Sequence, residues 1–173
     1  MQQTRYEKWY KKTALFLERH GKLKRLVLAL DTALPLVFYL AYAGLAVFSA
    51  YNLQLDFWLY FLSAGLPFFA FVLVSILRKI INRPRPYEEA GADIQPLHTR
   101  ENKKGESFPS RHAASAFVIA SVLIRLCLPI GITLLVLAIG ISFTRFFVGH
   151  HYPSDLIVGA LIGLAFGLPL WFI

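Results

Sequence analysis

The chain has 173 residues, of which 57% are hydrophobic and only 16% charged, and its mean hydropathy is +0.55. This composition is too apolar for an ordinary soluble domain of that size and indicates an integral membrane protein. The net charge of +8 resides in basic clusters between long uncharged stretches, which favours anionic membrane lipids and phosphate groups as partners and argues against nucleic acid.

The first predicted element is a basic amphipathic helix within residues 1–25. It carries eight lysines and arginines, and aromatic and leucine side chains recur between them at helical spacing. Helices of this kind lie on the membrane surface, with their apolar face in the headgroup region. The basic residues are Arg5, Lys8, Lys11, Lys12, Arg19, Lys22, Lys24 and Arg25.

Apolar segments make up most of the remaining chain, and each is close to the roughly 20 residues that a helix needs to cross the hydrocarbon layer. They lie at about residues 26–50, 57–77, 110–128, 130–147 and 153–173. A polar loop, residues 86–109, separates the second from the third and is expected outside the membrane. The sequence therefore predicts an all-α integral membrane helical bundle of about five transmembrane helices. Residues 26–173 are expected to form a single domain of a multi-pass protein in the cell membrane.

Two features inside these segments carry further predictions. Asp31 interrupts the first segment, and because an ionisable group in a membrane helix needs a partner, we expect an interfacial ion pair with Arg25. In the last segment, glycines recur every four residues at Gly159, Gly163 and Gly167, a spacing typical of close helix packing.

Three polar clusters stand at the ends of the apolar segments, and the first consists of Arg78, Lys79, Arg83, Arg85 and Pro86. Guanidinium groups match phosphate oxygens bidentately and stabilise the charge that develops in a transition state. Basic clusters also flank membrane helices for topological reasons alone. Only its companions therefore make this cluster a candidate phosphate site.

The second cluster, Pro109-Ser110-Arg111-His112, opens the third segment. Ser110 is placed near the N-cap of a helix, where free backbone amides and the helix dipole form an anion site. His112 is then a candidate general acid that protonates a leaving oxygen. Taken alone, the tetrapeptide is also consistent with an ordinary cap beside a surface histidine.

In the third cluster, Arg145 ends the fourth segment, and His151 and Asp155 open the fifth. Residues four apart at a helix start share a face, so the carboxylate reaches the imidazole. This set suits phosphoryl transfer through a phosphohistidine, in which Arg145 binds phosphate, His151 attacks and Asp155 orients the imidazole. Alternating crossings put all three clusters on one side of the membrane.

Together these residues resemble the signature of the type 2 phosphatidic acid phosphatase superfamily of integral membrane lipid phosphatases, which reads Lys-x6-Arg-Pro, Pro-Ser-Gly-His and Ser-Arg-x5-His-x3-Asp. The resemblance covers the chain from about residue 57 onward. It implies metal-independent, cofactor-free hydrolysis of a lipid phosphate or diphosphate, such as undecaprenyl diphosphate, phosphatidylglycerol phosphate or phosphatidic acid, through a phosphohistidine. The implied catalytic residues are His151, His112 and Asp155. The implied phosphate-binding residues are Arg78, Lys79, Arg85, Ser110, Arg111 and Arg145.

Three positions depart from the family pattern. Arg78 stands in place of lysine, with Lys79 adjacent to share its role, and Thr144 replaces serine but keeps the hydroxyl. Arg111 replaces a glycine, so its side chain either crowds the approach of phosphate to the backbone or adds a cation for a second phosphate. We hypothesise that Arg111 favours diphosphates or other highly anionic substrates.

Two other classes share part of the pattern. Vanadate-dependent haloperoxidases have the same anion-binding residue set, but they are soluble, which the apolar segments contradict. A catalytically degenerate lipid-phosphate binding or transport protein would keep the helices, although the intact His112, His151 and Asp155 argue against it.

The helix count and the side of the membrane complete the predictions. Five segments are one fewer than the six usual in the family, so the N-terminal helix is expected to stand in for a missing span. The basic N-terminal segment favours a cytoplasmic site by the positive-inside rule, whereas most bacterial members of the family face outward.

Overall fold

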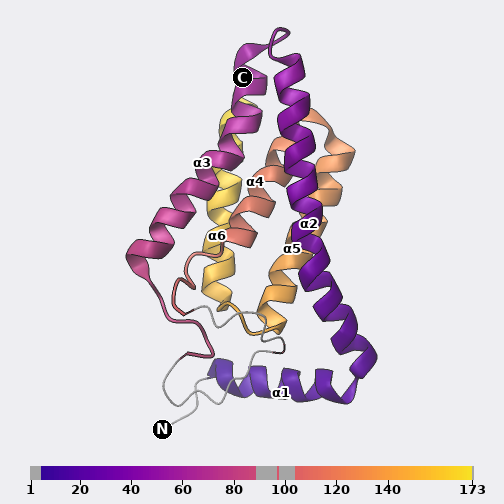
Figure 1. The fold of residues 1–173 in the computed structure, drawn as a ribbon, viewed down its shortest axis with the longest axis vertical. Helices are drawn as coiled ribbons and strands as arrows, with labels where there is room; N and C mark the ends of the chain where they lie inside the picture. The colour runs from indigo at the N-terminus through magenta and orange to yellow at the C-terminus, as the bar shows by residue number, and fades with distance from the viewer. Residues whose placement is uncertain (1–4, 89–96, 98–103, 173) are drawn as a thin grey trace.

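The computed structural model describes residues 5–88, 97 and 104–172, which form a bundle of helices (Figure 1). Most of the loop expected at residues 86–109 lies outside the described residues. In chain order the helices are α1 (Arg5–Arg19), α2 (Gly21–Asn52), α3 (Phe57–Ile81), α4 (Arg111–Leu126), α5 (Leu128–Phe147), α6 (Pro153–Gly167) and a final 3₁₀ helix, η1 (Leu168–Trp171).

Four segments of the described chain are long and apolar enough to cross a membrane: α2, α3, α5, and α6 continued by η1. The predicted all-α membrane bundle is therefore confirmed, and the protein is a multi-pass membrane protein. The expected third span is α4, which has 16 residues and packs against α2, α3, α5 and α6. Protein rather than lipid thus covers most of its surface, so a polar side chain such as Ser121 is tolerated there.

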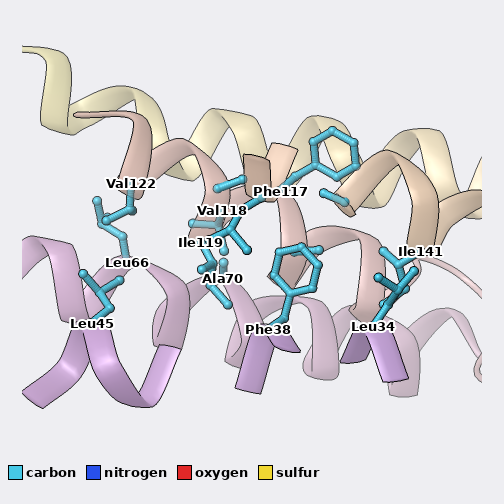
Figure 2. Close-up of a cluster of buried hydrophobic side chains, with 14 of the residues drawn as sticks. Leu34, Phe38, Leu45, Leu66, Ala70, Phe117, Val118, Ile119, Val122 and Ile141 are labelled. Atoms are coloured by element: carbon cyan, nitrogen blue, oxygen red, sulfur yellow. The ribbon is translucent and has the colours of Figure 1, made fainter. Parts of the chain in front are cut away.

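Apolar side chains from three helices surround α4 in a continuous core (Figure 2). Phe38 of α2, Ala70 of α3 and Ile141 of α5 are almost fully buried, as are Val118 and Val122 of α4. Burying an aliphatic or aromatic side chain contributes about 1.5–3 kcal/mol. This core therefore fixes α4, the helix whose first turn carries the second polar cluster.

The glycines of α6 allow it to lie directly on α4, as their spacing predicted. A Cβ atom at Gly159 would lie 2.6 Å from the Ser110 carbonyl oxygen, and one at Gly163 only 2.4 Å from that of Ala114. Both separations are far below van der Waals contact, so only glycine permits this approach. The close packing brings the first turn of α6, with Asp155, against the first turn of α4.

Helix α1 lies across the end of the bundle at which α4 and α6 begin (Figure 1). Tyr10 is buried, and its hydroxyl donates a hydrogen bond to the Val148 carbonyl oxygen at 3.1 Å. Burial raises the pKa of Tyr10 to about 12, so the hydroxyl remains a donor at neutral pH. Gly149 has a φ of +85°, and a Cβ there would meet the Tyr10 ring. The helix is thereby fastened to the turn that leads to His151.

Two helix boundaries differ from the expected ones. Helix α2 begins at Gly21 rather than at residue 26, because lysine and arginine are good helix formers and continue the helix beyond the apolar segment. Helix α3 continues past residue 77 and is capped by Asn82 in the left-handed conformation, two residues before Pro84. Arg78 therefore lies in the last turn of α3.

Candidate active site

The three polar clusters meet at the end of the bundle beside α1. Arg78 donates a hydrogen bond to the Pro109 carbonyl oxygen at 3.0 Å, and the Ser110 amide donates to the Asp155 carbonyl oxygen at 2.9 Å. Arg145 Nη2 lies 3.4 Å from His112 Nε2. These contacts join α3, α4, α5 and α6, so the three clusters lie together at one end of the bundle.

His151 is held in one orientation on the turn before α6. Its ring is only 2% exposed, and its Nδ1 atom lies 2.9 Å from the Ser107 carbonyl oxygen. Because a carbonyl oxygen can only accept, Nδ1 carries the proton of the neutral ring. Nε2 then carries the lone pair, which is the form that a nucleophilic imidazole requires.

Burial lowers the pKa of His151 to about 4. The Arg85 guanidinium lowers the pKa further by charge repulsion, whereas the hydrogen bond that His151 donates to the Asp155 carboxylate opposes the shift. The imidazole is therefore neutral at pH 7, and its lone pair is available.

This pKa shift predicts a pH-dependent stability. Unfolded His151 titrates near pH 6.5 and folded His151 near 4, so the unfolded chain binds the proton first as pH falls between these values. Thermal unfolding in detergent is thus expected at lower temperature as pH falls through this window. In His151→Asn that part of the pH dependence should vanish. A difference in melting temperature between the two proteins that stays constant from pH 4 to 8 would contradict the assignment.

Asp155 is fully buried and accepts several hydrogen bonds. The Tyr152 amide donates to it at 3.0 Å, Arg83 Nη1 at 2.8 Å, and the Ser107 hydroxyl also donates to it. His151 Nδ1 lies 3.6 Å from the carboxylate, farther than from the Ser107 carbonyl oxygen. The carboxylate therefore fixes the loop and the turn on both sides of the imidazole.

Two of these partners were not among the predicted site residues. Arg83 pairs with Asp155 and stacks over the Tyr152 ring, with its Cζ atom 4.2 Å from the ring centroid. Its place within the first basic cluster was a usable signal. Ser107 lies before the second cluster, and nothing in the local sequence distinguishes it from an ordinary loop serine.

Of the other predicted phosphate-binding residues, Arg78, Arg85 and Ser110 lie beside the histidines, whereas Lys79 points away from them. Arg78 and Arg85 are both buried, and Arg85 donates to the Gly105 carbonyl oxygen at 3.1 Å. Ser110 caps α4 and accepts from the Ala113 amide. The amides that precede Ala113 in this turn have no carbonyl four residues earlier within the helix, as at any helix start. Lys79 is exposed, because one residue further along a helix points about 100° away from Arg78.

Arg145 is paired with a residue of α2. Its Nε atom lies 3.3 Å from Asp31 Oδ1, and both side chains are largely buried. The predicted Asp31–Arg25 pair is therefore wrong. Residues six apart on a helix point to different faces, whereas Arg145 reaches Asp31 across the α2–α5 interface.

An apolar cavity of about 510 Å³ ends at this cluster. Helices α2 and α3 form its sides, and they separate toward the end of the bundle that holds the site (Figure 1). The first turns of α4 supply its floor, including Arg111 and His112. The lining side chains are mostly aromatic or aliphatic: Pro35, Phe38, Tyr39, Tyr42, Pro67, Phe68, Phe71, Ala116, Ile119 and Ile141.

Known proteins are similar to this chain over the residues that form the site. Residues 56–173 match the family model of the PAP2 superfamily. The lipid A 4′-phosphatase of Bacteroides thetaiotaomicron is 38% identical over 103 residues, which cover 57% of this chain and 46% of that protein. The undecaprenyl-diphosphatase BcrC of Bacillus subtilis is 30% identical over 110 residues, which cover 61% of this chain and 55% of that protein. This chain thus spans about half the length of these curated relatives.

A solved structure is similar over nearly the whole chain. The crystal structure of Aquifex aeolicus LpxE superposes with a TM-score of 0.62 at 29% sequence identity. The superposition covers 88% of this chain and 94% of the other, and so includes helices outside the residues that match the family model.

Proposed function

The chain belongs to the PAP2 superfamily, and on that premise we propose that it removes phosphate from a lipid phosphate monoester or diphosphate at the site around His151. One observation carries the proposal: the apolar cavity between α2 and α3 ends at His112, beside the arginine cluster. A lipid whose tail lies in this cavity would present its phosphate to the arginines. The names of the relatives, a lipid A phosphatase and an undecaprenyl diphosphatase, support a lipid phosphate as substrate.

In the first proposed step, the lone pair of His151 Nε2 attacks phosphorus. An N–P bond forms while the P–O bond to the lipid breaks, and His112 gives its proton to the leaving oxygen. Arg145 Nη2 donates to His112 Nε2 at 3.4 Å. Once the N–H groups of Arg145 bind phosphate oxygens instead, His112 Nε2 is free to accept a proton from solvent, and this is the proton that it gives to the leaving oxygen.

In the second step, water attacks the phosphohistidine. His112 now takes a proton from the water, the N–P bond breaks and inorganic phosphate leaves, which restores neutral His151. Asp155 stabilises the positive charge that the imidazole carries in between. The proposed roles of Arg78, Arg85, Arg145 and the first amides of α4 are to hold the phosphate oxygens and to stabilise the charge of the transition state.

The proposal is tested by phosphate release from the detergent-purified protein. The lipids to compare are lipid A, undecaprenyl diphosphate, phosphatidylglycerol phosphate and phosphatidic acid, each with and without EDTA. Release that persists in EDTA is expected, since the groups that act in every step above are protein groups and water. A folded protein that binds these lipids but releases no phosphate from any of them would instead be a lipid-phosphate binding or transport protein.

Arg111 supports a finer proposal, a preference for diphosphates. Its side chain lines the apolar cavity next to His112, with Cζ 5.8 Å from the centroid of the Phe71 ring, and within the described chain no carboxylate pairs with it. It therefore places positive charge on the side of phosphorus from which the lipid leaves. A diphosphate leaves as an anionic lipid monophosphate, whereas a monoester leaves as an alcohol. A cation at this position stabilises the first leaving group more than the second.

Replacing this arginine with the family's glycine should therefore lower the diphosphate preference. With farnesyl diphosphate and farnesyl monophosphate, which share one tail, Arg111→Gly is expected to reduce the ratio of the two kcat/KM values about tenfold, or ~1.4 kcal/mol. Arg111→Lys, which keeps the charge, should retain much of the ratio. An unchanged ratio in Arg111→Gly would rule out this role for the side chain.

A further inference from the structure

Asp31 is an ionisable residue inside a helix that crosses the membrane. It lies about three turns into α2 and is only 4% exposed. A buried carboxylate in such a helix is costly unless it is paired, and residues of this kind are commonly functional. Residues 56–173 match the family model, so Asp31 lies outside the matched region.

The Arg145 guanidinium group contacts Asp31 and two histidines near the site. On one side, Nε lies 3.3 Å from Asp31 Oδ1, and Nη2 donates to the Asp31 carbonyl oxygen at 3.3 Å. At the other end, Nη1 lies 3.3 Å from His150 Nδ1 and Nη2 lies 3.4 Å from His112 Nε2. Asp31 thus contacts Nε and Nη2, while Nη1 and Nη2 each also lie close to a histidine nitrogen.

We infer that Asp31 is a positioning residue, which holds Arg145 so that its terminal N–H groups meet the phosphate oxygens of the substrate. This inference rests on the proposed function of the site. The long side chain of Arg145 has many rotamers, and a second anchor on α2 removes that freedom before substrate binds. The carboxylate also balances the positive charge of Arg145. Helix α2 therefore contributes to catalysis as well as to the wall of the cavity.

The same ion pair would exist if Asp31 served only to stabilise the fold, so the test must separate the two roles. The variants are Asp31→Asn, which loses the charge, and Asp31→Glu, which keeps it. Leu45→Ala is the stability control, because Leu45 is a buried core residue at the far end of α2. The readouts are kcat and KM for farnesyl diphosphate, and the rise in melting temperature caused by orthovanadate, a phosphate mimic.

Asp31→Asn is expected to lower kcat/KM about 100-fold, the scale of a misplaced catalytic group. It should also reduce the stabilisation by orthovanadate, and Asp31→Glu should recover part of both. Leu45→Ala should lower the melting temperature yet keep the orthovanadate response. In an Arg145→Lys background, which has no planar fork to orient, Asp31→Asn should cause a much smaller further loss.

An Asp31→Asn protein that melts earlier but keeps wild-type kcat/KM and a full orthovanadate response would show that the pair is purely structural. An equal loss from Asp31→Asn in the wild-type and Arg145→Lys backgrounds would show that Asp31 does not act through Arg145. A wild-type protein that binds orthovanadate in an Asp31-dependent way but hydrolyses no lipid phosphate would support the inference while the proposed function failed.

Discussion

Replacing His151 with alanine is expected to abolish phosphate release. The proposed nucleophile is His151 Nε2, and the ring is neutral at pH 7 with its proton held on Nδ1 by the Ser107 carbonyl oxygen. Removing a nucleophile removes the covalent route entirely, so the loss in kcat should be on the order of 10⁴-fold or more. The matched control is His20→Ala, since His20 is exposed on the surface at the start of α2.

The decisive measurement is the trapping of the intermediate. After rapid quenching, wild-type protein given labelled lipid phosphate should carry the label in a bond that survives base and is broken by acid, as a phosphoramidate does. His151→Ala should carry no such label, and His20→Ala should behave as wild type. A His151→Ala protein that keeps more than about a tenth of the wild-type kcat would exclude this residue as the nucleophile.

Much of this site was predictable because its chemistry depends on short spacings. Arg145, His151 and Asp155 lie close together in the chain at the junction of two helices, so a helix start near residue 153 was enough to bring the imidazole and the carboxylate together. The ends of the apolar segments then placed Arg78 and Ser110 on the same side. The lengths of the apolar segments and the alternating direction of successive membrane crossings were therefore enough to predict the fold class and most of the residues near the site.

The contacts that were not predictable cross between helices. Asp31 and Arg145 are 114 residues apart, and their meeting depends on how α2 crosses α5, which local periodicity does not encode. The bond from His151 Nδ1 to the Ser107 carbonyl likewise depends on the path of a loop, because any residue could supply that oxygen. Which side chains pair within the site thus depends on how the helices and the loop pack, and not on the local sequence.

The position of α4 could not be predicted from its composition either. Residues 110–128 are apolar enough to suggest another lipid-facing span, yet α4 is surrounded by four other helices. A helix that is apolar on most faces is suited to either environment. The feature of the sequence that indicates a protein environment for α4 is the glycine spacing of α6, because such a spacing is explained by a closely packed neighbouring helix.

Asp155→Asn is expected to lower kcat/KM strongly, but less than His151→Ala. The buried carboxylate accepts hydrogen bonds from the Tyr152 amide, Arg83 and the Ser107 hydroxyl. An amide group has one acceptor oxygen in place of two, so it leaves at least one of these buried donors unpaired and loses the charge that stabilises the imidazolium. Loss of the corresponding aspartate in a catalytic triad costs about 10⁴-fold, in part because the imidazole adopts the wrong tautomer.

In this site the tautomer has a second support, because the Ser107 carbonyl oxygen lies 2.9 Å from His151 Nδ1 and the carboxylate lies 3.6 Å away. Asp155→Asn leaves that carbonyl in place, so residual activity about tenfold or more above that of His151→Ala is expected, a difference of ~1.4 kcal/mol in the barrier. Ser107→Ala removes the hydroxyl that donates to Asp155 but keeps the carbonyl, and should cost about tenfold in kcat/KM, the value of one hydrogen bond to a charged group. Were Asp155→Asn as inactive as His151→Ala, the carboxylate rather than the Ser107 carbonyl would have to hold the imidazole proton during the reaction.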